Sequence, residues 1–245
     1  MRDFTDRVAL VTGASRGIGA ATARLLAKGG ADVVINYRSK GPRAEQVAEA
    51  IRALGHRALP VQADLTDEAD MQQMIEAVRA EFGRVNLLFL NASGGMEKDK
   101  EAGYALQLNR DAQVRALDLT LPLMPDGSRI VFVTSHMAHF HGEKYVWPDY
   151  EVVAASKKAG EDALRARIPE LDARNIRLIV VSGDLIEGTI TAKLLERASP
   201  GRTEARRQKA GSVPTVEEFA AAVVDAAADA SLDSGTTLFV GDTEV

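Results

Sequence analysis

The amino-acid sequence predicts a single α/β domain built on one mostly parallel sheet of seven strands, with helices on both faces. Apolar, strand-like runs alternate with amphipathic helical stretches along nearly the whole chain, which is the order that parallel βαβ units require. The 245 residues, 46% of them hydrophobic, suffice for one sizeable core, and no repeat, linker or low-complexity segment divides them. Right-handed crossovers then give a doubly wound sheet, with the ligand site beyond the carboxyl ends of the strands.

Each element of this fold is predicted from a local pattern. Short apolar runs bounded by turn residues predict strands, and longer runs with helical periodicity predict helices. The expected strands span residues 8–12, 32–37, 58–62, 87–91, 129–134, 177–182 and 236–240. The expected helices lie near residues 17–29, 44–54, 67–82, 106–121, 148–168 and 216–228. Residues 188–215 are charged and carry Pro200-Gly201, so we expect either a mobile helical lid over a substrate or a solvated face, and the length of the segment favours the lid.

The composition narrows the range of functions. The formal net charge is −5 at pH 7, which gives binding to nucleic acid no electrostatic support. The chain has no cysteine, and this excludes a disulfide framework, a thiolate metal site and a cysteine nucleophile. The first residues do not read as a signal peptide, and no apolar run is long enough to span a membrane. We therefore expect a cytoplasmic protein that acts on a small molecule.

A glycine-rich loop connects the first expected strand to the first expected helix. Residues 12–19 read Thr-Gly-Ala-Ser-Arg-Gly-Ile-Gly. Glycines allow backbone N–H groups to approach phosphate closely, and the following helix presents its positive end to the same point. The order strand, glycine loop, helix is the context that a dinucleotide-binding site requires. The residues predicted to hold the pyrophosphate are Gly13, Ser15, Arg16, Gly17, Ile18 and Gly19.

The ends of the next strands indicate which dinucleotide binds. An acidic residue after the second strand would accept a hydrogen bond from the ribose 2′-hydroxyl of NAD, but this strand ends in Asn-Tyr-Arg. Arg38 and Arg16 can instead bind a 2′-phosphate, so we predict NADP(H), although a loop arginine is often simply solvated. Asp64 can accept from the adenine amino group or cap the following helix. The small residues at 91–95 allow a ligand to approach the backbone closely.

Taken together, these motifs resemble the short-chain dehydrogenase/reductase family, near its ketoacyl-reductase-like branch, over almost the whole chain. The matching residues are 12–19, Asp64-Leu65, Asn91-Ala92-Ser93-Gly94, Asn109, Ser135 and Ser156-Lys157. Ser182-Gly183 stands where the family usually has Pro-Gly. The resemblance implies a doubly wound (Rossmann) domain and an NADP(H) site that includes Asp64, Leu65, Asn91, Ala92, Ser93, Lys157 and Gly183.

The resemblance also implies roles for the catalytic residues. In such a site Asn109 orders a water, Lys157 binds the nicotinamide ribose and Ser135 polarises the carbonyl of a small-molecule substrate. Family members are commonly dimers or tetramers. This chain is therefore expected to form a homo-oligomer that pairs the helices near 106–121 and 148–168.

One expected residue is missing. The family places a tyrosine four residues before the lysine as proton donor or acceptor, and that position is Val153. Tyr150 lies one turn earlier, where ideal helix geometry would tilt its ring away from the site; packing, with the hydroxyl at the surface, is its alternative role. Tyr145, in the inserted segment after Ser135, is a further candidate, and so is His136, whose imidazole can hold a proton near neutral pH.

His136 is also one of three histidines within six residues. With His139 and His141 it offers three imidazoles, a ligand type that zinc binds. The spacing matches no known zinc template, and no acidic ligand is obviously paired with it. We therefore predict no metal.

Three functions are compatible with this pattern. The first, which Asn109, Ser135 and Lys157 favour, is an NADPH-dependent ketoreductase with a non-standard proton donor. An aromatic polyketide-like substrate would suit it, because a phenol next to the carbonyl can supply a proton. The alternative, which Val153 favours, is a non-redox cyclase, dehydratase or lyase that uses the cofactor structurally. The third is a cofactor-sensing protein or scaffold without chemistry.

Overall fold

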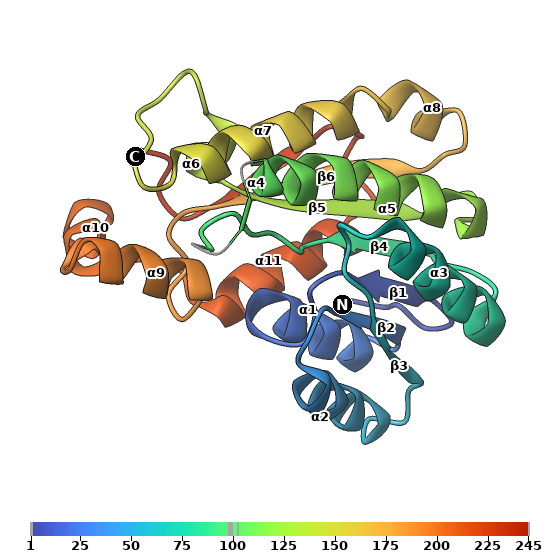
Figure 1. Ribbon diagram of the computed structural model, residues 1–245. Helices are drawn as coiled ribbons and strands as arrows, with labels where there is room; N and C mark the ends of the chain where they lie inside the picture. Colours follow the sequence, from blue (N-terminus) through green and yellow to red (C-terminus); the bar gives the residue numbers. More distant parts are fainter. Residues whose placement is uncertain (1, 98–99, 102, 245) are drawn as a thin grey trace.

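The computed structural model describes residues 2–97, 100–101 and 103–244. Within them, seven strands form one parallel sheet in the order β3-β2-β1-β4-β5-β6-β7 (Figure 1). The strands are β1 (Val8–Val11), β2 (Asp32–Tyr37), β3 (Ala58–Gln62), β4 (Leu87–Leu90), β5 (Arg129–Ser135), β6 (Arg177–Gly183) and β7 (Thr237–Val240). The strand order reverses between β1 and β4, so a ligand crevice is expected beyond their carboxyl ends. The predicted doubly wound sheet is confirmed.

Helices cover both faces of the sheet and close two hydrophobic cores (Figure 1). On one face lie α1 (Gly17–Lys28), α2 (Gly41–Arg52) and α11 (Val216–Ala228), with Leu26 and Val223 in their core. On the other lie α3 (Glu68–Phe82), α5 (Ala112–Thr120) and α7 (Glu151–Arg165), with Met74 and Leu164 in theirs. The central strands β1 and β4 are buried along their whole length, which is why their sequences are continuous apolar runs.

Two predicted helices are interrupted, and the first interruption lies beside the site. The stretch predicted at 106–121 is α4 (Tyr104–Leu106), a π-helical turn η1 (Gln107–Asp111), α5 and a short 3₁₀ turn η2 (Leu121–Leu123). Such π-helical turns occur frequently at functional sites. The stretch predicted at 148–168 is α7, followed by α8 (Ile168–Asp172). Gly160 on α7 allows close packing on η1, because a Cβ there would lie 2.0 Å from the Asn109 carbonyl oxygen.

Residues 188–215 form two helices, α9 (Ile190–Ala198) and α10 (Arg202–Ala210), which project from the body of the domain (Figure 1). The two ends of this segment are joined, because the Glu187 backbone N–H donates to the Pro214 carbonyl at 2.9 Å. The Glu196 carboxylate accepts hydrogen bonds from the turn between the two helices and holds them together. The helices are present as expected, and their function as a lid stays a prediction.

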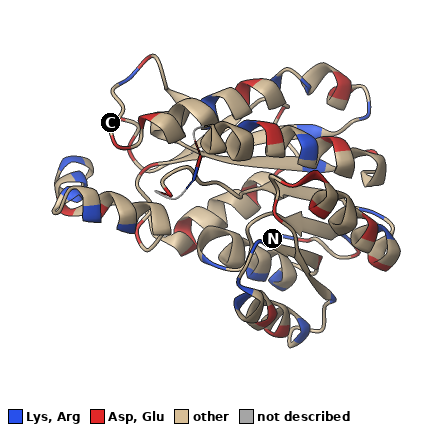
Figure 2. Ribbon diagram, viewed as in Figure 1, with Lys and Arg blue, Asp and Glu red and all other residues tan. Residues whose placement is uncertain are grey.

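Acidic and basic side chains are interspersed along outer helices such as α2, α3 and α10 (Figure 2). This mixture is typical of a solvated surface. Among the described residues, no helix combines the length and the apolar character needed to cross a membrane. The expected pairing of chains through α5 and α7 stays a prediction.

Candidate active site

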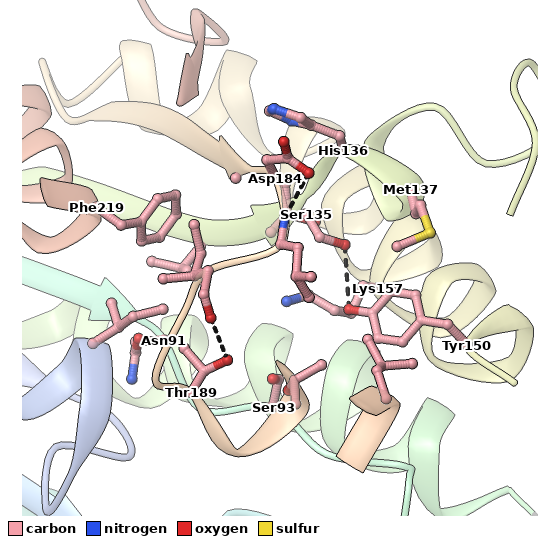
Figure 3. Close-up of a pocket in the computed structure, with 18 of the residues that line it drawn as sticks. Asn91, Ser93, Ser135, His136, Met137, Tyr150, Lys157, Asp184, Thr189 and Phe219 are labelled. Atoms are coloured by element: carbon pink, nitrogen blue, oxygen red, sulfur yellow. Dashed lines mark hydrogen bonds between the residues drawn. The ribbon is translucent and has the colours of Figure 1, made fainter. Parts of the chain in front are cut away.

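A cavity of about 790 Å³, part of it open to solvent, lies beyond the carboxyl ends of β4, β5 and β6 (Figure 3). Its polar side chains include Asn91, Ser93, Ser135, Tyr150, Lys157 and Thr189. Its apolar side chains include Ile18, Met137, Trp147, Leu185, Leu195 and Phe219. The structure therefore brings together three of the predicted catalytic residues. Ser135 ends β5, Tyr150 directly precedes α7 (Glu151–Arg165), and Lys157 lies within α7.

Ser135 and Tyr150 present their hydroxyl groups to each other in this cavity (Figure 3). The two oxygens are 3.2 Å apart, and either can be the donor. Ser135 ends β5 and caps α6 (His136–His139), where its Oγ also accepts from the Ala138 backbone N–H at 3.3 Å. Tyr150 immediately precedes α7, and its backbone N–H donates to the Trp147 carbonyl at 2.8 Å. Backbone hydrogen bonds thus fix both residues where they enter the cavity.

Tyr150 does not lie where ideal helix geometry predicts. It is 5% exposed, and its hydroxyl points into the cavity rather than to the surface. The expectation was wrong because Tyr150 stands before the helix, with φ of −115° and a turn behind it, so the tilt of helical side chains does not apply to its ring. Val153, at the position of the family's tyrosine, packs beside it in the same apolar cluster.

Lys157 enters the same cavity two helical turns further along α7. Its pKa falls from the ordinary 10.5 to about 8, because burial disfavours the charged ammonium, while Glu161 on the next turn partly opposes this effect. At neutral pH the ammonium is therefore still charged, inside a mostly apolar wall. It can stabilise an anion or donate hydrogen bonds to ribose hydroxyls there.

His136 is among the residues that line the cavity, but its ring turns away from the two hydroxyls (Figure 3). Its Nδ1 forms a 2.8 Å hydrogen bond with Ser182 Oγ, and its ring packs against Phe239. Burial lowers its pKa from 6.5 to about 4, so the imidazole is neutral at physiological pH. This geometry does not favour the predicted role of His136 as proton donor. Tyr145, the other candidate, is 63% exposed and is not among the residues that line the cavity.

The other two neighbouring histidines have separate partners. His139 Nδ1 lies 2.8 Å from a Glu161 carboxylate oxygen, and His141 Nε2 lies 2.7 Å from Glu151. In the part of the chain that the structure describes, no three His, Cys, Asp or Glu side chains gather closely enough to hold a metal ion.

Asn109 connects the loop after β4 to α7 through side-chain hydrogen bonds. Its Nδ2 donates to the Gly94 carbonyl at 2.8 Å and to Ser156 Oγ at 2.9 Å, and its Oδ1 accepts from the Gly94 N–H at 3.2 Å. These contacts use both amide hydrogens and fasten the loop after β4 to α7. The water that the resemblance assigns to Asn109 stays a prediction.

The glycine loop fits a dinucleotide phosphate. Gly13 and Gly17 have φ of +65° and +54°, values that residues with a Cβ rarely adopt. A Cβ on Gly19 would lie 2.6 Å from the Gly13 carbonyl oxygen and from Asn91 Nδ2. The first turn of α1 carries no acidic residue, so its positive end is available to an anion. Gly183, also predicted to contact the cofactor, lines the cavity.

Two buried polar residues, to which the sequence assigned no role, shape this loop. Thr12 Oγ1 accepts from the backbone N–H groups of Asn91 and Ala92 at 2.9 and 3.0 Å. Asn36 Oδ1 accepts from the Gly13 N–H at 3.1 Å, and its amide also donates to the loop after β3. Together they join the end of β2 and the loops that follow β1, β3 and β4. A polar residue at the end of a buried apolar run is the signal that identifies both.

Arg16 and Arg38 both lie exposed at the carboxyl edge of the sheet. Arg16 is the N-cap residue of α1, and Arg38 directly follows β2. Arg38 donates a hydrogen bond to the Tyr104 hydroxyl, a contact between α4 and the end of β2 that the sequence does not reveal. Both residues therefore stand at the edge of the sheet where a 2′-phosphate is expected.

Asp64 forms a local turn rather than a helix cap. Its Oδ1 accepts from the backbone N–H and the hydroxyl of Thr66 at 2.9 and 2.7 Å. The N-cap of α3 is Asp67, whose carboxylate accepts from the Asp70 N–H at 3.0 Å. Contact between Asp64 and an adenine amino group stays a prediction.

Comparisons with known proteins agree with this geometry. Residues 7–199 match the family model described as short chain dehydrogenase. The cis-4-hydroxycyclohexanecarboxylate dehydrogenase of Sinomonas cyclohexanicum is 34% identical over 238 residues, which cover 93% of this chain and 92% of that protein. The hydroxynaphthalene reductase arp2 of Aspergillus fumigatus is 30% identical over 206 residues, which cover 81% of this chain and 73% of that protein.

A solved structure extends the similarity to the whole domain. The angucycline C-6 ketoreductase LanV, in a crystal structure with bound NADP, is 28% identical and superposes with a TM-score of 0.82. The match covers 98% of this chain and 96% of that one. By sequence and by fold, this chain belongs to the short-chain dehydrogenase/reductase family of oxidoreductases.

Proposed function

We propose that this enzyme is an NADP(H)-dependent ketoreductase that reduces a ketone on an apolar, ring-containing substrate and takes the proton from Tyr150. The observation that carries the proposal is the pair of hydroxyls, Ser135 and Tyr150, 3.2 Å apart in a cavity that Lys157 also lines. Tyr150 supplies from another sequence position the acid that Val153 lacks. A hydroxynaphthalene reductase and an NADP-bound C-6 ketoreductase among the similar proteins support reduction and this cofactor.

The residues that would hold the cofactor surround one end of the cavity. When bound, NADPH supplies a hydride to the carbonyl carbon of the substrate. The loop 12–19 and the N-terminus of α1 would hold its pyrophosphate, and Arg16 and Arg38 its 2′-phosphate. Lys157 would donate hydrogen bonds to the ribose hydroxyls from the side of α7.

Ser135 and Tyr150 act together on the carbonyl oxygen. Because their hydroxyls are close, one oxygen atom can accept from both, and these hydrogen bonds strengthen as negative charge develops on it. Burial raises the pKa of Tyr150, so its phenol is protonated at neutral pH and can give the proton to the forming alkoxide. The Lys157 ammonium stabilises the remaining phenolate until solvent returns a proton.

The walls of the cavity favour an apolar substrate. Met137, Leu185 and Leu195 are buried in one cluster with Tyr150, and Trp147 packs against it. A flat hydrocarbon or aromatic ring gains roughly 25 cal/mol for each Å² of apolar surface that such walls remove from water. The hydroxyl pair then provides the polar contact that orients the reacting carbonyl.

The non-redox alternative depended on the absence of an acid at position 153. With the Tyr150 hydroxyl beside Ser135, the chain has an acid in the place where the reduction of a ketone needs one. This arrangement favours reduction over a cyclase, dehydratase or lyase, and reduction is the function that we propose.

The test is the loss of NADPH absorbance during turnover with a panel of aromatic and aliphatic ketones. Net consumption is expected with the aromatic members. Tyr150→Phe should lower kcat by ~10²–10⁴-fold, the usual contribution of a general acid. Tyr145→Phe is the matched control, because it alters an exposed tyrosine of the same loop. Product formed without NADPH consumption would support the non-redox alternative, and full activity of Tyr150→Phe would exclude Tyr150 as the donor.

A further inference from the structure

We infer that Arg202 on α10 is a positioning residue for Tyr150, so that the proton donor is in place only when the α9–α10 segment is docked on the domain. The inference rests on the proposed role of Tyr150. It assigns to the segment 188–215 a second task besides covering the cavity, which is to hold the loop that carries the acid.

Arg202 contacts two of the residues that precede α7, Trp147 and Asp149. Its Nη1 donates to both carboxylate oxygens of Asp149, at 3.0 and 2.7 Å. Its guanidinium also lies over the indole of Trp147, 4.5 Å from the ring centroid. The Tyr150 N–H then closes the turn onto the Trp147 carbonyl at 2.8 Å. One side chain, only 15% exposed, therefore holds the first and third residues of the turn that ends at Tyr150.

The loop before Tyr150 is held by apolar packing of Val146 and Trp147 and by the polar contact from Arg202. Residues 145–147 form no regular element, and Tyr145 at their start is largely exposed. A tyrosine inside α7 would be held in register with Lys157 by helical hydrogen bonds. Tyr150 is the N-cap residue: its carbonyl accepts from the Ala154 N–H at 2.8 Å, but its own N–H bonds to the preceding turn. The direction of its ring therefore depends in part on tertiary contacts, and the contact from α10 is charged, planar and partly buried.

α10 is itself anchored to the floor of the cavity. One turn after Arg202, the buried Arg206 binds Asp184 at 2.8 and 3.0 Å, directly after the end of β6. It also donates to the carbonyls of Asp242 and Glu244 near the C-terminus, at 2.6 and 2.5 Å. Arg202 and Arg206 therefore couple one helix to the acid-bearing loop and to the strand end that borders the substrate.

This coupling has a consequence for the reaction. The same docking of α9 and α10 that places Leu195 over the cavity also places Arg202 over Trp147. Enclosing the substrate and aligning the acid are then one event, so proton transfer follows closure of the cavity.

The experiment compares Arg202→Met with Arg207→Met in the full chain. Arg207 is the matched control, because it lies on the same helix but pairs with Glu187 and Glu204 instead of the loop. Trp147 is the chain's single tryptophan, so its fluorescence reports on the loop without any substrate. Arg202→Met should increase quenching of this fluorescence by acrylamide, and Arg207→Met should not.

Turnover of an aromatic ketone with NADPH provides the second readout. Arg202→Met should lower kcat by ~10–100-fold with little change in NADPH affinity, and Arg202→Lys, which keeps the charge, should restore part of the rate. In a Tyr150→Phe background the same substitution should cost almost nothing more, because the residue it positions is gone.

Equal losses of kcat in both backgrounds, or unchanged Trp147 quenching, would overturn the positioning role while leaving Tyr150 as the donor. Full activity of Tyr150→Phe alone would instead remove the proposed donor and the inference with it. The two failures are distinguishable, because only the second appears in the single Tyr150 variant.

Discussion

Replacing Lys157 by methionine should stabilise the cofactor-free protein while removing most of its activity. Burial lowers the pKa of Lys157 from 10.5 to about 8. Each tenfold change in a protonation equilibrium corresponds to ~1.4 kcal/mol, so keeping the ammonium charged costs the folded state about 3 kcal/mol relative to the unfolded chain. Methionine has a similar length and no charge. The variant should therefore gain about 1–3 kcal/mol, the lower value applying where cavity water solvates the ammonium.

The assay is urea unfolding of the two proteins between pH 6 and pH 10.5. Below about pH 8 the lysine is charged in both the folded and the unfolded state, so the advantage of the methionine variant is full there. Between pH 8 and 10.5 the unfolded chain binds more protons, the stability of the parent rises, and the difference shrinks.

Lys158→Met is the control for this experiment. Lys158 is the next residue of α7, but it is paired at 2.8 Å with Asp162 at the surface. Its replacement should change stability by a few tenths of a kcal/mol, with no such pH dependence. A Lys157→Met protein that is less stable than the parent, or whose advantage does not change with pH, would show that the ammonium is not desolvated as we reason.

Arg38→Ala should weaken NADPH binding far more than NADH binding in fluorescence titrations, and equal weakening would contradict contact with a 2′-phosphate. Ketone reduction should slow as the pH rises through about 8, because Lys157 then loses the charge that stabilises the Tyr150 phenolate; a pH–rate profile that stays flat to pH 10 would count against this role. Gly160→Ala should lower the free energy of unfolding by ~3 kcal/mol or more, or prevent folding, because its Cβ would meet the Asn109 carbonyl at 2.0 Å; an unchanged urea midpoint would mean that α7 can shift freely.

The cofactor half of the molecule could be predicted from the sequence because its signals are local. Each predicted strand boundary lies within one residue of the observed one. The loop 12–19 needed only residue type and order, since the positive φ of Gly13 and Gly17 is a property that glycine itself supplies. The contacts of Asn36 and Thr12 could not be predicted from the sequence, because they join segments that are far apart in it.

The catalytic half could not be predicted to the same depth because tertiary contacts decide it. The orientation of His136 depends on Ser182 at the end of β6 and on Phe239 of β7, more than 45 residues away. The helix predicted at 148–168 begins only at Glu151, and this shift by a few residues places Tyr150 outside the helix. An uncertainty of that size at a helix end is ordinary, yet here it decides whether a tyrosine faces water or Ser135.

If Tyr150 is the proton donor, as we propose, its displacement changes what controls the reaction. Four residues before Lys157, an acid would be aligned by the helix itself, whether or not a substrate is enclosed. At the N-cap, the alignment of Tyr150 depends on the turn from Trp147 and on Arg202 of α10. Part of the preorganisation of the acid then comes from a contact between α10 and the loop before α7, instead of from α7 alone. The proposal then predicts that the rate depends on how well a given substrate allows α9 and α10 to dock. Substrates that fill the apolar wall at Leu195 gain both binding energy and an aligned acid, whereas small ketones gain neither, and this ties substrate size to kcat as well as to KM.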